Sequence, residues 1–171
     1  MFTPQVYGSW QDVQWEKYDE FLRIMGRDFF SSMLEKRVLD IGSGSGYLER
    51  FLVSKEFDVK NVISLDIRRD FMKKVDKENL VVGDGKFLPF KNGRFDAVIS
   101  VDTMHLVKDT DFARVLKPGG LALLSVFFSH GVYEERRNLL RSLLADFQII
   151  FEFEIHGKEK EYVILARKAV Q

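Results

Sequence analysis

The stretch Val38-Leu39-Asp40-Ile41-Gly42-Ser43-Gly44-Ser45-Gly46 decides the fold of this chain. Its first four residues form a short apolar run interrupted by one carboxylate, which is typical of a buried strand. Three glycines follow at alternate positions, and glycine tolerates the backbone conformations that a tight turn requires. Apolar residues then return at helical spacing over residues 47–52. The stretch therefore predicts a strand, a glycine-lined bend and a helix in immediate succession.

The same alternation extends in both directions from this unit. Further strands are expected at residues 61–66, 80–82, 95–101 and 121–128, and further helices at residues 12–33, 69–75, 104–115 and 132–145. Proline and glycine in Lys117-Pro118-Gly119-Gly120 stand where a type II turn favours them. Apolar and polar residues alternate over 147–155, and a turn at 156–158 leads to a partner strand at 162–167. We therefore predict an α/β fold with a mostly parallel sheet, helices on both faces and an antiparallel C-terminal hairpin.

Composition limits what this domain contains. The 171 residues fit a single domain, with 46% hydrophobic and 30% charged residues. The 26 basic and 26 acidic side chains cancel, so overall charge does not favour nucleic acid or an anionic membrane as a partner. The absence of cysteine excludes disulfides, thiolate catalysis and cysteine-based zinc sites. Because the three histidines, His105, His130 and His156, lack the spacing of metal ligands, no metal is expected.

Two further features of the sequence bear on location. The N-terminal residues lack the basic and apolar regions of a signal peptide. No apolar run approaches the ~20 residues that a membrane-spanning helix needs. We therefore expect a cytoplasmic protein without a membrane partner.

The glycine-lined bend indicates the kind of ligand. In an open parallel sheet the ligand binds beyond the carboxyl ends of the strands, where the strand order reverses. A dinucleotide fingerprint would place its third glycine at position 47, which is Tyr47, and the Gly-Lys-Ser/Thr of a phosphate-binding Walker loop is missing. Asp40 at the strand tip suits a cationic ligand better than a phosphate. The alternative is that residues 42–46 are only a tight connection between strand and helix.

Carboxylates at the next two strand ends favour a ligand over a mere turn. Asp66 closes the second strand, 24 residues after Gly42, where a carboxylate can accept hydrogen bonds from both hydroxyls of a ribose. Asp84 follows the third strand and can accept from the amino group of an adenine, while a neighbouring backbone N–H serves a ring nitrogen. Acidic residues at the ends of three consecutive strands predict a binding site for a positively charged adenosyl compound.

Five ordered motifs resemble those of class I S-adenosylmethionine-dependent methyltransferases. They lie at residues 38–46, 64–67, 82–90, 95–107 and 114–120, so the resemblance covers roughly residues 36–128. The nearest group contains ubiquinone and menaquinone biosynthesis enzymes and many small-molecule methyltransferases. The resemblance implies a three-layer Rossmann-like fold with a seven-stranded sheet, S-adenosyl-L-methionine as cofactor and S-adenosyl-L-homocysteine as product.

The resemblance also implies which residues hold the cofactor. Asp40, Gly42 and Gly44 would face its methionine half, Asp66 and Ile67 the ribose and adenine, and Asp84 and Gly85 the adenine edge. The full set of implied cofactor-binding residues is Asp40, Gly42, Ser43, Gly44, Gly46, Tyr47, Asp66, Ile67, Gly83, Asp84, Gly85, Ser100 and Val101.

Two residues are candidates for a catalytic base at the end of the fourth strand, where acceptors meet the methyl group in this fold. Asp102 is the first, with helix capping or simple solvent exposure as the alternative. His105 is the second, and packing at the cofactor edge is the alternative for it. The Asn-Pro-Pro-Tyr device that binds planar amino groups is missing at this position.

The single domain is expected to consist of three parts. Residues 1–34 form an N-terminal segment and helix, residues 36–128 the cofactor-binding core, and residues 129–171 a helix and the hairpin. The helix after the fourth strand is short for the family, and no inserted segment near residue 130 supplies a lid. The N-terminal aromatics are either a lid or simple helix packing; they are Tyr7, Trp10, Trp15 and Tyr18.

The acceptor stays open at this stage. A small metabolite is favoured because the chain carries no visible macromolecule-binding module. RNA or protein is an alternative acceptor, and a non-catalytic S-adenosylmethionine-binding partner subunit is a third reading. The basic residues suggest solvated helix faces more than an RNA-binding stripe; they are Arg68, Arg69, Lys73, Lys74, Lys77, Arg136, Arg137 and Arg141. The oligomeric state is not indicated by the sequence.

Overall fold

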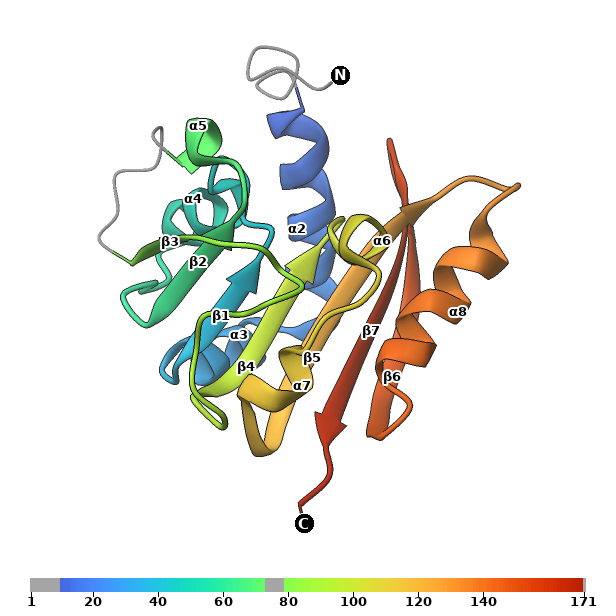
Figure 1. Cartoon of the computed structure of the whole chain (residues 1–171). Coiled ribbons are helices and arrows are strands. Elements are labelled where there is room, and N and C mark those ends of the chain that lie inside the picture. The colour runs from blue at the N-terminus through green and yellow to red at the C-terminus, as the bar shows by residue number, and fades with distance from the viewer. Residues whose placement is uncertain (1–9, 73–78, 171) are drawn as a thin grey trace.

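A seven-stranded sheet runs through the molecule between two layers of helices (Figure 1). The computed structural model describes residues 10–72 and 79–170. Its strands are β1 (Val38–Ile41), β2 (Val62–Asp66), β3 (Leu80–Val82), β4 (Phe95–Val101), β5 (Leu116–Phe128), β6 (Phe147–His156) and β7 (Lys160–Lys168). Their spatial order is β3-β2-β1-β4-β5-β7-β6. The pairings from β3 to β5 are parallel, whereas β7 is antiparallel to both β5 and β6, as predicted.

The strand order reverses between β1 and β4, which places the ligand-binding crevice of such a sheet at their carboxyl ends. Ser100 ties the two ends together, because its buried hydroxyl donates a 2.8 Å hydrogen bond to the carbonyl of Ile41. The first strand therefore delivers its glycine-lined bend against a fixed neighbour.

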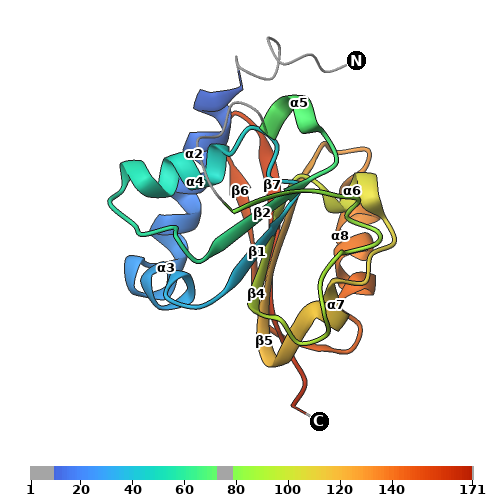
Figure 2. The same cartoon turned by 60° about the vertical axis from the view of Figure 1, so that its left-hand side comes forward.

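Three helices cover one face of the sheet: α2 (Gln11–Met25), α3 (Arg27–Leu34) and α4 (Tyr47–Ser54). The view in Figure 2 shows these helices on one side of the sheet and α6–α8 on the other. Aromatic and aliphatic side chains of α2–α4, including Phe21, Phe30 and Phe51, form one core with alternate residues of the central strands.

The opposite face carries α6 (Met104–Val107), α7 (Phe112–Val115) and α8 (Tyr133–Leu143), while α5 (Arg69–Met72) follows β2. A second core lies on this face and contains Met104, Phe112 and Leu140. Between β3 and β4 the chain crosses this face as a loop instead of a helix (Figure 1). Arg114 holds that loop, because its guanidinium donates to the carbonyls of Phe90 (2.6 Å) and Leu88 (2.9 Å).

Two predicted helices are interrupted in the structure. The helix expected at 12–33 breaks at Gly26, whose φ of 85° ends α2 and begins α3 in a new direction. The helix expected at 104–115 divides into α6 and α7, because Lys108 adopts a φ of 59° that a right-handed helix does not permit. The helix expected at 69–75 is present from Arg69 to Met72, and its remainder lies outside the described residues.

The turn expected at 117–120 is present as a bulge within β5. Phe95 pairs with Leu116 and Ala97 pairs with Leu121, so four residues of β5 loop out between two successive contacts. Gly119 has a φ of 75°, as the third residue of a type II turn requires. Among the described residues, no helix is long and apolar enough to cross a bilayer.

Replacing Arg114 by methionine tests the anchoring of the loop between β3 and β4. The change removes charge-assisted hydrogen bonds to two carbonyls while keeping the aliphatic stem. We expect Arg114→Met to lower the free energy of unfolding by about 2–3 kcal/mol in urea titrations. Arg94→Met, at an exposed arginine of the same loop, is the matched control and should be neutral. An equal loss in both variants would contradict the anchoring role.

Candidate functional site

The glycine-lined bend after β1 is packed so closely at Gly42 that a side chain would not fit there. Gly42, Gly44 and Gly46 have φ values of 80°, 56° and 70°. A Cβ atom on Gly42 would lie 2.0 Å from the Oγ1 atom of Thr103, which follows β4. The Gly42 N–H donates to the carbonyl of Leu65 at the end of β2 (2.7 Å). The bend is therefore held between the ends of β2 and β4.

Asp66 at the end of β2 holds the bend from the other side. Its Oδ2 accepts a 2.9 Å hydrogen bond from the N–H of Gly44, and its Oδ1 accepts one of 2.7 Å from the N–H of Arg68. Each oxygen has capacity for a second donor, such as a sugar hydroxyl. Ile67, directly after it, is 63% exposed and offers an apolar surface beside the carboxylate.

Two more of the expected carboxylates lie at neighbouring strand ends. Asp40 is buried in β1, one residue before the strand ends. Asp84 follows β3, and its Oδ1 accepts the N–H of Lys86 (2.9 Å) in a tight turn. Gly85 is buried beside it, and its carbonyl accepts a 2.7 Å hydrogen bond from the hydroxyl of Thr110. The structure thus brings the three acidic strand ends to one edge of the sheet.

Several expected cofactor residues serve the framework of this site. Ser100 is fully buried and bonded to Ile41, and Val101 packs against the core beneath α2. Tyr47 is 4% exposed, with the guanidinium of Arg50 over its ring at 4.8 Å. The remaining members shape the backbone: Ser43 is buried and accepts from Gly46 N–H (2.9 Å), and Gly83 N–H donates to the carbonyl of Asp66 (3.0 Å).

These features fit an adenosyl compound with a positive charge. The segment from Asp40 to Tyr47 contains no lysine or arginine to bind a pyrophosphate. Carboxylates stand at the ends of β1 and β2 and just after β3, and that of Asp66 bonds directly to the bend. The two surface hollows described in the structure, of about 280 and 310 Å³, lie at the amino ends of the strands, so they do not compete with this assignment.

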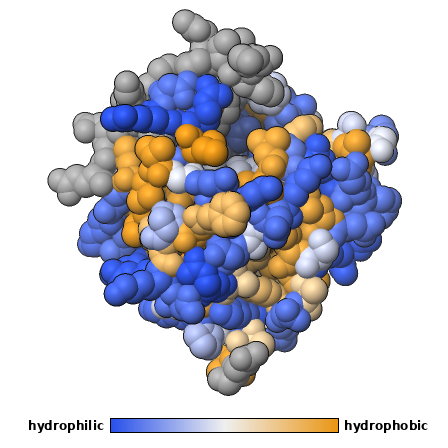
Figure 3. Space-filling view, viewed as in Figure 1, coloured by the Kyte–Doolittle hydropathy of each residue, from blue (hydrophilic) through white to orange (hydrophobic). Residues whose placement is uncertain are grey.

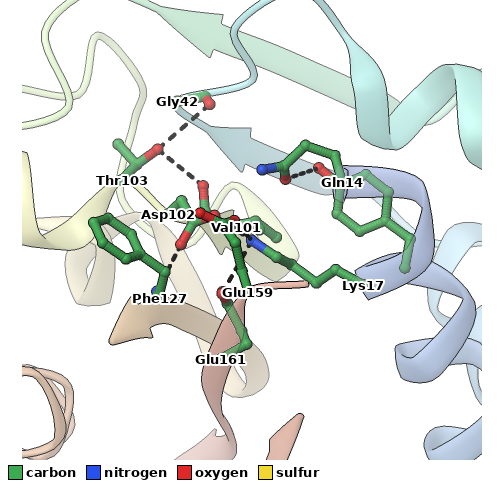
Figure 4. Close-up of polar contacts among 10 residues, drawn as sticks. Gln14, Lys17, Gly42, Val101, Asp102, Thr103, Phe127, Glu159 and Glu161 are labelled. Carbon is green, nitrogen blue, oxygen red and sulfur yellow. Dashed lines mark hydrogen bonds and ion pairs between the residues drawn. The ribbon is translucent and has the colours of Figure 1, made fainter. Parts of the chain in front are cut away.

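A buried lysine from α2 reaches the end of β4 (Figure 4). The ammonium of Lys17 forms an ion pair with Asp102 and lies 3.4 Å from Glu159 Oε2 and 3.0 Å from Glu161 Oε2 on the hairpin. Lys17 is 3% exposed and Glu161 is fully buried. The second oxygen of Asp102, Oδ1, accepts a 2.7 Å hydrogen bond from the N–H of Phe127. We call Lys17, Asp102, Glu159 and Glu161 the acidic cluster.

For Asp102 the structure bears on the two alternatives to a catalytic role, and the role as a base stays a prediction. This residue neither caps α6, whose N-cap is Thr103, nor faces solvent freely. Its φ of 56° turns the side chain toward α2, where both oxygens are engaged. The sequence carried one signal for this arrangement: Lys17 stands on the buried face of its helix with Tyr18 and Phe21.

Burial and charge act against each other in the acidic cluster. Burial alone would lower the pKa of Lys17, but the negative charges of Glu161 and Asp102 outweigh it and the pKa is raised. Burial raises the pKa of Glu161 well above its usual range, and the charge of Asp102 adds to that effect while Lys17 opposes it. Lys17 is therefore charged at neutral pH, and Glu161 holds a proton more readily than an ordinary glutamate.

His105 lies in α6 near the same strand end but outside the acidic cluster. Its ring meets that of Phe127 edge-on, with centroids 5.3 Å apart. Burial lowers the pKa of His105 to about 4, and the positive charge of Arg136 contributes. The imidazole is therefore neutral at pH 7 and a poor proton acceptor.

The N-terminal aromatics that fall within the described residues act mainly in packing. Trp15 meets Phe51 of α4 edge-on at 6.0 Å, and Tyr18 is 5% exposed with its ring 5.5 Å from that of Phe51. Trp10 is partly buried just before α2, and Tyr7 lies outside the described residues. These contacts attach α2 to α4 and support the packing interpretation of Trp15 and Tyr18, and the lid stays a prediction. Within the described ranges, no group of three histidine, aspartate or glutamate side chains could hold a metal ion.

Comparison with known proteins identifies the family. Residues 39–124 match the family model described as a methyltransferase domain, and this segment is half of the chain. The chain belongs to the class I S-adenosylmethionine-dependent methyltransferases. A solved S-adenosylmethionine-dependent methyltransferase from Methanosarcina mazei has the same fold, with a TM-score of 0.64 at 20% identity over 80% of this chain and 93% of the other.

The curated relatives that the chain matches differ in the chemistry that their names state. The human mitochondrial arginine-hydroxylase NDUFAF5 is 33% identical over 59% of this chain and 31% of its own length. The fatty-acid O-methyltransferase of Mycolicibacterium smegmatis is 35% identical over 52% of this chain and 36% of its own length. The matched segment thus spans about a third of each of these relatives. The comparisons do not single out the ubiquinone and menaquinone group.

Removal of the Lys17 ammonium tests the acidic cluster. Lys17→Met leaves buried carboxylates without their counter-charge, and we expect a loss of about 3–5 kcal/mol in the free energy of unfolding near pH 8. Because the folded state binds protons on Glu161 more readily than the unfolded state, the loss should shrink as the pH is lowered toward 5. Denaturant titrations across this range measure it. Lys60→Met, at an exposed ion pair with Asp58, is the control, and a pH-independent loss at Lys17 would refute the buried-charge account.

Proposed function

We propose that this domain transfers the methyl group of S-adenosylmethionine to a small metabolite. The observation that carries the proposal is the placement of Asp40, Asp66 and Asp84 at the carboxyl ends of three neighbouring strands, beside a glycine-lined bend where the strand order reverses. When bound, the cofactor supplies an activated methyl group. The protein therefore has to bind the cofactor and the acceptor, orient them toward each other and exclude water.

The proposed roles of the site residues follow their positions. Asp66 accepts hydrogen bonds from the ribose hydroxyls while it continues to hold the N–H of Gly44, and the exposed Ile67 lies against the adenine. Asp84 and Gly85 serve the adenine edge. Gly42, Gly44 and Gly46 let the backbone approach the methionine half, with Asp40 close to its positive charges. The remaining expected residues form the framework that positions these groups; they are Ser43, Tyr47, Gly83, Ser100 and Val101. The site needs no metal.

A small acceptor is favoured by the charge distribution on the described surface. The guanidinium groups of Arg137 and Arg141 both lie against Glu152, at 3.4 and 2.8 Å, and that of Arg68 pairs with Asp70 at 2.7 Å. These pairs break up the basic runs that would otherwise favour an RNA acceptor; Lys73, Lys74 and Lys77 lie outside the described residues. The fatty-acid O-methyltransferase among the relatives acts on a small acceptor by its name, which supports the same proposal.

The proposal also includes the division of the domain, its location and its activity as a single chain. The division at residues 34–36 and 128–129 stays a prediction, as does a cytoplasmic location. The domain binds its cofactor and catalyses transfer as a single chain, which distinguishes it from a non-catalytic partner subunit.

The proposal is tested by label transfer. The purified protein is incubated with S-adenosylmethionine labelled in its methyl group and with fractionated extract of the source cells. We expect label in the small-molecule fraction. Label confined to RNA or protein would replace the proposed acceptor class, and no transfer to any fraction together with intact cofactor binding would favour the partner-subunit reading.

Cofactor binding is tested separately at Asp66. We expect Asp66→Asn to weaken the binding of S-adenosylhomocysteine by about tenfold or more in calorimetry, because a charged acceptor for ribose hydroxyls becomes a neutral one. Asp70→Asn, four residues further on and exposed, is the matched control and should bind as the unmodified protein does. Equal affinity of the Asp66 variant would remove this carboxylate from the site.

A further inference from the structure

Two buried polar atoms without hydrogen-bond partners lie at the ends of β4 and β5. They are Nδ1 of His105 and Nε of Arg136, and neither meets an acceptor or donor within the described residues. Both side chains flank the ring of Phe127: the imidazole meets it edge-on at 5.3 Å, and the guanidinium carbon lies 5.3 Å from its centroid. Buried polar atoms in proteins are normally satisfied, so two together indicate a binding partner for them.

The charge around these two atoms favours an anion. Arg136 has no carboxylate within ion-pair distance in the described part of the chain, whereas its neighbours Arg137 and Arg141 share Glu152. The positive charges of Arg136 and Lys108 both act on His105. The negative charge of Asp102 opposes them, but that carboxylate forms an ion pair with Lys17. An arginine binds a carboxylate or a phosphate through paired N–H donors, so a carboxylate is among the anions that fit Arg136.

The absence of a free proton acceptor among the described residues at this strand end also favours a carboxylate. Methylation of a hydroxyl requires a base that takes up the released proton, and an amine has to lose its proton before it can attack. The oxygens of Asp102 are engaged by Lys17 and by the N–H of Phe127, and the low pKa of His105, about 4, makes it a poor acceptor. A carboxylic acid with an ordinary pKa of about 4 arrives at neutral pH without its proton, so it needs no base.

We propose that Arg136 and His105 form the acceptor subsite and that the acceptor is a carboxylate, which is methylated at oxygen. This inference rests on the proposed function and names its substrate class. A carboxylate oxygen forms a bond to the methyl carbon, the carbon–sulfur bond of the donor breaks with its electron pair on sulfur, and no proton moves. Leu106, next to His105 and 72% exposed, offers apolar surface to the body of the acid. The subsite lies between α6 and α8, where both meet the end of β5 (Figure 1).

The stability of the product toward base distinguishes this substrate class. After label transfer from methyl-labelled S-adenosylmethionine to extract fractions, mild alkali releases volatile methanol from a methyl ester, whereas label on nitrogen, carbon or sulfur stays bound. We expect most of the incorporated label to be volatile. Volatile label in the small-molecule fraction supports the inference. Volatile label confined to the protein fraction keeps a carboxyl as the methylated group but overturns the small acceptor of the proposed function. Label that is incorporated but stable to alkali overturns the inference and leaves the proposed function intact.

Substitutions in α8 test whether Arg136 binds the acceptor. We expect Arg136→Gln to lower the release of volatile label at least about tenfold, through loss of a charged hydrogen bond, while S-adenosylhomocysteine binds within about twofold of the unmodified affinity. Arg137→Gln, one position along the same helix and already paired with Glu152, is the matched control and should keep the rate. Equal rates in the two variants would overturn the subsite.

A titration of His105 by nuclear magnetic resonance gives a readout that is independent of activity. Because the positive charge of Arg136 lowers the pKa of His105, its removal in Arg136→Gln should move that pKa upward from about 4. An unchanged value would show that the two side chains do not face a common space and would overturn the inference even if the variant were inactive.

Discussion

The close approach of Gly42 to Thr103 is the constraint on which the site depends. It joins the bend after β1 to the end of β4 at the point where the strand order reverses, and any Cβ at Gly42 would fall inside the side chain of Thr103. The hydrogen bonds from Gly44 to Asp66 and from Ser100 to Ile41 fix the same region from β2 and from β4. The bend therefore has its shape before any ligand arrives, and a ligand that binds there does not have to order it.

A second constraint connects parts of the chain that are far apart in sequence. Lys17 belongs to the first helix, Asp102 to the end of β4, and Glu159 and Glu161 to the terminal hairpin, and all of them meet in one buried cluster (Figure 4). Such a cluster stabilises little by itself, because desolvation offsets much of the attraction. It does specify position: a helix displaced from this site would leave buried carboxylates without their cation. The acidic cluster thus fixes α2 beside the end of the strand that carries Asp102.

The sequence predicted the parts of the fold that are encoded locally. The glycine bend, the strand alternation and the acidic strand ends are patterns of neighbouring residues, and the sheet has the predicted arrangement. The break at Gly26 and the division at Lys108 depend on single backbone conformations, which periodicity does not reveal. The engagement of Asp102 by Lys17 depends on a contact across 85 residues, and only the position of Lys17 on a buried helix face hinted at it. The site as a strand-end geometry was therefore predictable, whereas the charge state of its side chains was not.

Phe127 divides the end of the sheet into two electrostatic environments. Its backbone N–H donates to Asp102 of the acidic cluster, while its ring contacts both His105 and the guanidinium of Arg136. Surface hydrophobic groups lie among the charged ones on the face seen in Figure 3, and Leu106 next to His105 is one of the exposed apolar side chains. The acidic cluster thus lies on the α2 side of Phe127, and the guanidinium of Arg136 comes from α8. A cation held at the bend and an anion held at Arg136 would each lie in the field that favours it, and transfer between them would need neither a metal nor a proton acceptor.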